Sequence, residues 1–243
     1  MRNRIIHKVD QLKHYINSLS GGIYAEYRSA IVMFHHVSNE PMHDVAPSSK
    51  CTIDEFEQIL DYVKEDVVSI DEMLLMIRQE NYRGRNYVLT FDDVAEDFYH
   101  NAFPRLQQAN IPFVLYITYE YIDKAGYLSR RQLLDIAASP LSTIGAHTMT
   151  HPLLRARGVD LNREICVARD KLSELIDQKV VHFAYPYGSS HAIDGRVVGF
   201  TARAGFDSAV ATLAGYLNPY TVHNVYRLPR VHNRLFMAEY MHS

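Results

Sequence analysis

Short apolar runs alternate along this chain with segments in which apolar residues recur every three or four positions. The runs predict strands at 30–36, 67–70, 87–93, 112–118, 142–146, 181–185, 206–211 and 225–228. Helical spacing predicts helices at 52–63, 71–79, 96–109, 129–137, 160–178 and 193–204. Short strands that are apolar along their length and alternate with helices are typical of an α/β protein with a parallel, buried sheet.

About seven strand–helix units can be counted, which is too many for a small open sheet and close to a barrel. No linker, composition shift or repeat divides residues 1–243, so we predict a single catalytic domain. Residues 1–22 precede this alternation and predict an N-terminal helix that ends at Gly21. We expect this helix to pack on its own domain. Peripheral docking to a membrane or a partner is the alternative, and the helix lacks the strongly basic face that would favour it.

Composition excludes several classes of function. Hydrophobic residues make up 47% of the chain, enough for a sizeable core, and the net charge of -3 with scattered Lys and Arg argues against a nucleic-acid surface. Cys51 and Cys166 are far apart and are interpreted as reduced, packed thiols. No stretch is long and apolar enough to span a bilayer, and the N-terminus lacks the apolar core of a signal peptide. We therefore expect a cytoplasmic protein, unless a leader has been removed.

Polar side chains follow three of the predicted strands at the point where each strand ends. Asp92 and Asp93 end one apolar run, His147 follows another, and Tyr187 follows a third. Catalytic groups of parallel βα folds gather at these carboxyl ends. Two buried carboxylates need a partner, and a metal ion is one such partner. Taken alone, each histidine would be an ordinary surface or core residue. Taken together with the aspartates, they indicate a site.

The spacing of His147 and His151 lets both imidazoles share one ion. Pro152 disfavours α-helical backbone at His151, so we expect a tight loop here rather than a helix. Two histidines and one carboxylate with open positions suit catalytic Zn²⁺, and Co²⁺, Ni²⁺ or Fe²⁺ would also fit. Successive side chains on a strand point to opposite sides, so Asp92 and Asp93 suit two different roles.

Three segments in this order resemble the first three motifs of the NodB-type polysaccharide deacetylases, carbohydrate esterase family four. They are Thr90–Asp93, His147–Pro152 and Phe183–Gly188. The resemblance extends from about residue 31 to residue 231 and leaves the N-terminal helix outside. It implies a distorted (β/α)₇ barrel that removes N- or O-acetyl groups from sugars with the help of a divalent metal, commonly zinc.

The resemblance also implies roles for individual residues. Asp93, His147 and His151 would bind the metal, and Asp92 would be the general base. The backbone N–H of Tyr187 would stabilise the negatively charged oxygen that forms at the acetyl carbon.

The acid that protonates the leaving amine comes from a late motif in this family. Residues 225–232 are the late segment that resembles it, so His232 is the first choice and His223 the second.

The chain departs from the family pattern in three places. Val94 stands where a glycine is common, and Ala184 stands where an arginine often pairs with the base. Our hypothesis is that Arg230 replaces this arginine from the last strand. The tryptophan of the fourth motif is absent because the chain contains no Trp, and Asp207 is a candidate remnant of that motif.

The leading prediction is a metal-dependent hydrolase that removes acetyl groups, above all N-acetyl groups, from a sugar, an oligosaccharide or a cell-surface glycan precursor. One alternative is hydrolysis of a non-sugar amide or cyclic imide on the same scaffold. The other is a degenerate glycan-binding domain, which the intact aspartates and histidines argue against.

Overall fold

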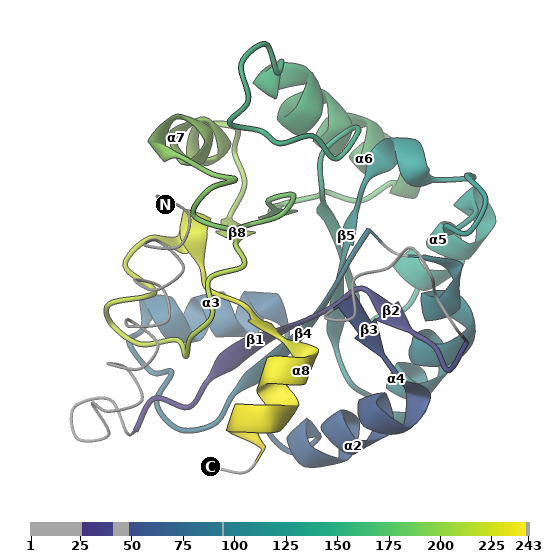
Figure 1. Ribbon diagram of the computed structural model, residues 1–243, viewed down its shortest axis with the longest axis vertical. Coiled ribbons are helices and arrows are strands. Elements are labelled where there is room, and N and C mark those ends of the chain that lie inside the picture. The colour runs from purple at the N-terminus through teal and green to yellow at the C-terminus, as the bar shows by residue number, and fades with distance from the viewer. Residues whose placement is uncertain (1–25, 41–48, 94, 242–243) are drawn as a thin grey trace, which may run out of the picture.

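The computed structural model describes residues 26–40, 49–93 and 95–241. Within them a seven-stranded, all-parallel sheet has the order β8-β7-β6-β5-β4-β1-β9, which confirms the predicted parallel arrangement (Figure 1). Its strands are β1 (Ala30–Phe34), β4 (Tyr87–Asp92), β5 (Phe113–Ile117), β6 (Ser142–Ala146), β7 (His182–Ala184), β8 (Ser208–Val210) and β9 (Val231–His232). A short parallel pair, β2 (His36–Val37) with β3 (Lys50–Cys51), lies beside it.

The two edge strands of the curled sheet are linked by the chain that runs from Leu228 to β9. The Leu228 N–H donates to Ala209 O at 3.0 Å, and the Ala211 N–H donates to Leu228 O at 2.9 Å. β9 then pairs with β1. The sheet therefore forms the distorted (β/α)₇ barrel that the resemblance implied.

The predicted strand at 225–228 is wrong. Val225–Arg227 forms the 3-10 turn η5, and the strand lies later, at β9. Pro229 explains the shift, because it has no N–H for a sheet ladder and restricts the residue before it. Leu228 alone bridges to Val210.

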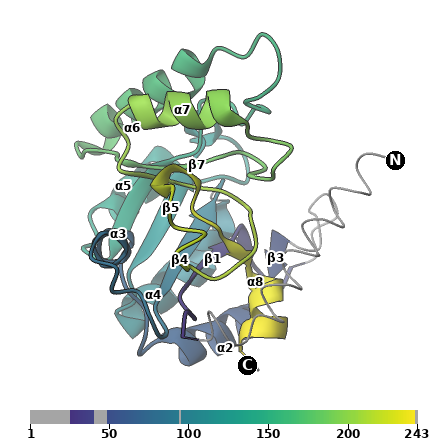
Figure 2. The ribbon, with the colours of Figure 1, turned by 90° about the vertical axis from the view of Figure 1, so that its left-hand side faces the viewer.

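Helices surround the sheet (Figure 2). They are α2 (Ile53–Val63), α3 (Ile70–Arg78), α4 (Phe103–Ala109), α5 (Arg130–Ala137), α6 (Ala168–Ile176), α7 (Gly195–Arg203) and the short α8 (Asn233–Leu235), and all but α3 pack on the outer face of the sheet or at its edge. Thr52, Ser69 and Ser129 each form a capping box with the Glu or Gln three residues later. Because Ser69 caps α3, the predicted strand at 67–70 is also wrong, and only Val67 makes a bridge, to Tyr87.

Two predicted helices begin with a π-helical segment: η2 (Phe98–Ala102) precedes α4, and η4 (Asn162–Val167) precedes α6. Pro104 explains η2, because it cannot donate the hydrogen bond that would continue an α-helix across this point. The wider turn at η4 contains Glu164, a carboxylate that is only 4% exposed.

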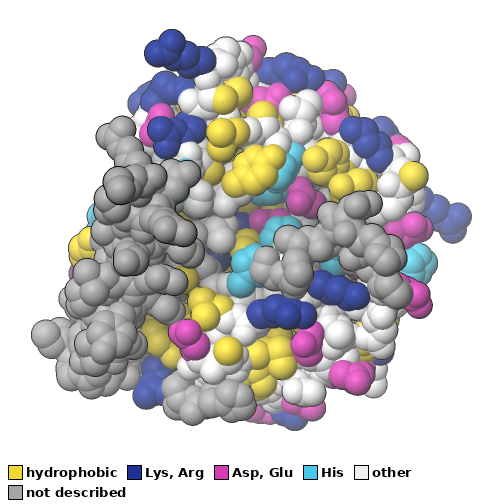
Figure 3. Space-filling model, viewed as in Figure 1, with side chains coloured by type: hydrophobic (Ala, Val, Ile, Leu, Met, Phe, Trp, Pro, Cys, Tyr) yellow, Lys and Arg dark blue, Asp and Glu magenta, His cyan; other side chains and the backbone are white. Residues whose placement is uncertain are grey.

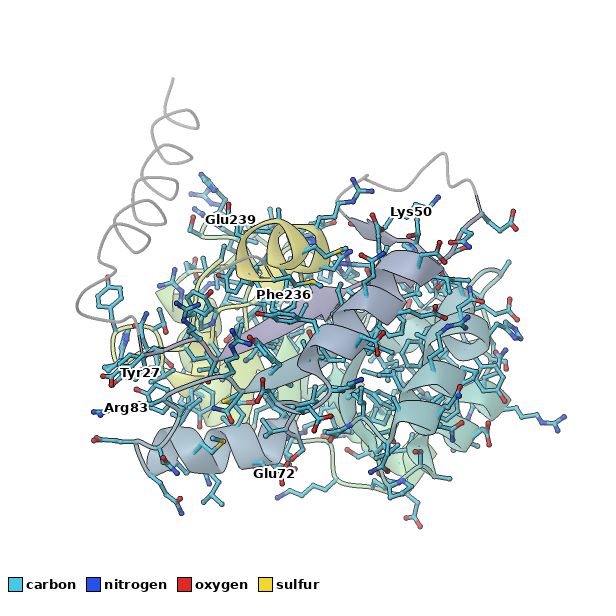
Figure 4. All side chains as sticks on the ribbon, turned by 90° about the horizontal axis from the view of Figure 1, so that it is seen from below. Tyr27, Lys50, Glu72, Arg83, Phe236 and Glu239 are labelled. Atoms are coloured by element: carbon cyan, nitrogen blue, oxygen red, sulfur yellow. The ribbon has the colours of Figure 1, made fainter. Side chains whose placement is uncertain are left out.

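The core has two parts, one between sheet and helices and one inside the barrel. The inner part packs α3, through Met73 and Leu74, against Ile31, Val88 and Val114. Figure 4 shows α3 along one edge of the molecule, with Glu72 near one end and Tyr27 and Arg83 near the other. Since residues 67–71 contact the first residues of β4 and β7, α3 closes the amino ends of the strands and leaves their carboxyl ends open.

The helix predicted at residues 1–22, with its alternative docking role, lies outside the described residues. Among the described residues no helix is both long and apolar enough to cross a bilayer. Cys51 is buried, Cys166 is half-buried, and both are free thiols as expected.

Candidate active site

Three predicted ligands meet at the carboxyl ends of β4 and β6. Asp93 follows β4, and His147 and His151 belong to the loop after β6. His147 Nε2 lies 3.8 Å and His151 Nε2 3.6 Å from Asp93 Oδ1. The ligand atoms of all three lie within 4.8 Å of one another. Figure 3 shows histidine and acidic side chains gathered near the middle of one face, with hydrophobic side chains above them.

The protonation of the two imidazoles suits metal binding. His147 donates its Nδ1–H to Ala184 O at 2.8 Å, so its lone pair is on Nε2, which faces the aspartates. Burial and the nearby His147 lower the pKa of His151, which favours the neutral ring that a metal needs. One carboxylate and two such imidazoles fit a divalent ion of the zinc type.

The loop that carries both histidines is tight, as Pro152 predicted. Thr148 and His151 have left-handed backbone, with φ of 73° and 61°. The His151 N–H donates to Thr148 Oγ1 at 2.9 Å, which closes the turn. An α-helical His-x-x-x-His is therefore excluded here.

The two adjacent aspartates have different surroundings. Asp92 is the last residue of β4 and is 2% exposed. Asp93 leaves the strand with a left-handed φ of 59° and is half-buried. Thr118 donates its hydroxyl to Asp93 Oδ1 at 3.3 Å. Asp93 thus faces the histidines from the rim, while Asp92 lies beneath, with Oδ2 4.0 Å from His147 Nε2.

Arg230 forms a bidentate ion pair with Asp92. Its Nη1 and Nη2 donate to the two carboxylate oxygens of Asp92, each at 2.6 Å, and Arg230 is itself fully buried. Arg230 immediately precedes β9, so it reaches the carboxylate from the start of the last strand rather than from the strand predicted at 225–228. The guanidinium also donates to Thr90 Oγ1 at 3.3 Å and lies 5.5 Å from the centre of the Tyr116 ring.

This pairing determines the charge state of Asp92. Burial by itself would raise the pKa of Asp92, but the charge and hydrogen bonds of Arg230, together with the charge of His147, hold it well below its usual range. Asp92 is therefore ionised at neutral pH.

His232 is the last residue of β9 and stacks on His35, with ring centres 5.5 Å apart and planes 10° apart. Burial lowers the pKa of His35 to about 4, although Asp92 and Asp93 act to raise it. His35 directly follows β1, the neighbour of β4 in the sheet, so it lies at the same edge as the aspartate pair. Sequence reasoning gave His35 no role, yet the signal was present, because His35 also ends an apolar strand.

Tyr187 lies beside the cluster, with its ring 4.9 Å from that of His151 and its side chain 60% exposed. Its φ is 62°, which is uncommon for a bulky residue. The next residue, Gly188, also has a positive φ, and a Cβ there would lie 2.4 Å from Thr212 Oγ1. Only glycine fits this approach, so the turn holds Tyr187 in place.

Two other candidate residues, His223 and Asp207, do not enter this arrangement. His223 is exposed, and its ring pairs with Tyr220 O. Asp207 is exposed and precedes β8, so it lies at the opposite end of the strands and is not a remnant of a motif at this site. Val94 lies outside the described residues.

A family model described as polysaccharide deacetylase matches residues 79–209, more than half of the 243 residues. The chain belongs to this family of NodB-type deacetylases. The match contains the segments of Asp92, His147 and Tyr187. No curated protein matches the chain.

Several solved deacetylases share the fold of this chain. IcaB from Ammonifex degensii superposes with a TM-score of 0.75 at 22% identity, over 88% of this chain and 97% of the other. The deacetylase PplD of Streptococcus pyogenes, solved in complex with acetate, has a TM-score of 0.71 at 20% identity, over 86% and 96%. The BpsB deacetylase domain of Bordetella bronchiseptica has a TM-score of 0.67 at 15% identity, over 83% and 94%.

Proposed function

We propose that this polysaccharide deacetylase depends on a divalent metal and releases acetate from N-acetylated sugar units of a glycan or glycan precursor. The observation that carries the proposal is the convergence of one carboxylate and two Nε2 atoms beside a second, ionised carboxylate. The acetate in the PplD structure supports acetyl as the group removed.

When bound, a divalent ion at Asp93, His147 and His151 would polarise the acetyl carbonyl and make a water more acidic. Zn²⁺ is the first choice for this donor set, with Co²⁺, Ni²⁺ and Fe²⁺ as alternatives.

The remaining steps belong to the chain's own residues. Asp92 takes a proton from the attacking water, whose oxygen bonds to the acetyl carbon. The backbone N–H of Tyr187 donates to the carbonyl oxygen as it becomes negative. The carbon–nitrogen bond breaks as His232 gives a proton to the leaving nitrogen, and the products are acetate and a free amine.

Arg230 acts through Asp92 rather than on the substrate. A bidentate guanidinium holds the carboxylate plane in one orientation and supplies the opposite charge that a buried carboxylate requires. In this family an arginine often pairs with the base, and its position is occupied here by Ala184. Arg230 takes over the role of that arginine.

The decisive experiment is an acetate-release screen over N-acetylated oligosaccharides and sugar–lipid precursors, with a non-sugar amide and a cyclic imide as rival substrates. We expect release from a sugar substrate, loss on chelation and recovery with added Zn²⁺, and no release by Asp92→Asn. Turnover of the cyclic imide alone would favour the first alternative. Sugar binding without turnover would favour a degenerate binding domain.

The proton donor is tested separately with His232→Ala and His35→Ala. If His232 protonates the leaving nitrogen, His232→Ala lowers the rate of hydrolysis of amides, which have poor leaving groups. It lowers the rate far less for an activated ester, whose leaving group needs no proton. His35→Ala is the matched control from the same stacked pair. A normal rate for His232→Ala on every substrate would move the acid role elsewhere.

A further inference from the structure

The loop that carries His147 and His151 has an unfavourable backbone. Two of its non-glycine residues, Thr148 and His151, have positive φ, a conformation that persists only where neighbouring structure enforces it. Since this loop sets the direction of two imidazoles, its supports decide where the ligand atoms lie.

One support comes from the segment after β5. The Tyr119 N–H donates to Thr148 O at 3.1 Å, and the Glu120 N–H donates to Met149 O at 3.0 Å. These bonds satisfy two loop carbonyls.

Glu164 supplies the second support from η4. Its Oε2 accepts the N–H of Met149 at 3.1 Å and that of Thr150 at 2.9 Å, and its Oε1 accepts the Thr150 hydroxyl at 3.1 Å. A carboxylate suits this position because it accepts hydrogen bonds through two oxygens and donates none. Bonds to an ionised acceptor are also about twice as strong as neutral ones.

The charge of buried Glu164 is balanced by Arg163. One guanidinium nitrogen of Arg163 donates to Glu164 Oε1 at 2.9 Å, and the other donates to Glu120 Oε1 at 2.7 Å. Arg163 thus links the two supports, so that residues from both sides enclose the loop.

We propose that Glu164 is a positioning residue for the metal centre: its carboxylate locks residues 148–151 so that the imidazoles of His147 and His151 face Asp93 before an ion arrives. This inference rests on the metal dependence proposed above. Sequence reasoning missed it because Glu164 is an isolated acid beside the apolar stripe of a helix, and only the fold brings it under the loop.

The test compares the Zn²⁺ affinity of Glu164→Ala, Glu164→Gln and Thr150→Val with wild type, by competition with a chromophoric chelator. Removal of such a partner behind metal ligands typically weakens binding by about 10- to 100-fold, and we expect this for Glu164→Ala. Glu164→Gln keeps one acceptor oxygen and should lose less, and Thr150→Val should lose least. Glu174→Ala, an exposed glutamate on α6, is the control and should bind as wild type.

The melting temperature of each metal-free variant separates positioning from plain stability. If Glu164 only stabilises the fold, Glu164→Ala melts earlier but binds Zn²⁺ as wild type does, which overturns the proposal. If Glu164→Ala does not fold, the affinities of Glu164→Gln and Thr150→Val decide, and wild-type values for both overturn it. A wild-type protein that binds no Zn²⁺, Co²⁺, Ni²⁺ or Fe²⁺ would refute the metal-dependent function itself, and the inference with it.

Discussion

Two polar clusters lie at opposite ends of the same barrel and differ in how well their atoms are paired. The carboxyl-end cluster contains Asp92, Asp93, His147, His151 and Arg230. The amino-end cluster contains Asp71, His182 and Ser208. His182 Nδ1 and Ser208 Oγ are hydrogen-bonded at 2.9 Å, and His182 Nε2 and Asp71 Oδ1 at 3.2 Å.

The amino-end cluster has the residue types of a serine hydrolase triad, yet its geometry argues for structure. Ser208 and His182 are both fully buried, so no substrate reaches the hydroxyl. Both ring nitrogens of His182 are paired, and Asp71 in the first turn of α3 ties that helix to β7 and β8. In the carboxyl-end cluster, by contrast, the nearest carboxylate oxygens to His147 Nε2 are 3.8 and 4.0 Å away, too far for hydrogen bonds. The two clusters therefore differ in whether their nitrogen and oxygen atoms are hydrogen-bonded to one another, and this difference identifies the carboxyl-end cluster as the candidate active site.

The largest expected difference between the clusters is in metal content. We predict about one divalent ion per chain, lost in Asp93→Ala, His147→Ala or His151→Ala because each removes one of three ligands. His182→Ala, in the amino-end cluster, should keep it. Elemental analysis of the purified proteins measures this, and full metal content in all three ligand variants would show that the ion binds elsewhere.

The next effect concerns turnover without metal loss. Asp92→Asn removes the base while leaving the three ligands, so we expect acetate release to fall by about 10²- to 10⁴-fold with metal content unchanged. Acetate release and elemental analysis on one preparation measure both quantities. Undiminished release would remove Asp92 from the mechanism.

A third effect concerns stability at the carboxyl-end cluster. Arg230→Met leaves a buried carboxylate without its cation, and breaking such a pair costs about 3–5 kcal/mol of unfolding free energy. Denaturant unfolding measures this cost. The double variant Asp92→Asn with Arg230→Met should recover part of it, because the amide carries no charge. A single Arg230→Met variant as stable as wild type would mean that Asp92 finds another partner.

The smallest effect is at the amino-end cluster. The hydrogen bond from His182 lowers the pKa of Asp71, with the charges of His182 and Arg78 adding to it. A lowered folded-state pKa contributes stability above the unfolded value near 4, and this contribution disappears as pH falls through the folded value. The Asp71 side chain is 70% exposed, so we expect less than about 1 kcal/mol. As the pH is lowered from about 6 to about 3, the denaturant midpoint of unfolding should therefore fall slightly less for Asp71→Asn than for wild type.

Local pattern was sufficient for most elements, because their causes are local. The capping boxes at Thr52, Ser69 and Ser129 mark three helix starts in the sequence itself. The two wrong strand predictions, at 67–70 and 225–228, also have local causes. Ser69 begins a helix rather than continuing a strand, and Pro229 shifts the last strand to β9.

The candidate site also has one part that the sequence predicts and one part that it does not. The sequence by itself determined which side chains end the strands, since an apolar run followed by Asp92–Asp93 or by His147 places them at one edge of a parallel sheet. Only the tertiary structure decided how they are held. The bidentate ion pair of Arg230 with Asp92 joins residues that are 138 positions apart in the chain, and the hydrogen bonds of Glu164 to Met149 and Thr150 depend on the turn of η4. Such pairings are decided by distance in space, because a buried charge takes whichever partner the closed barrel brings within hydrogen-bond reach.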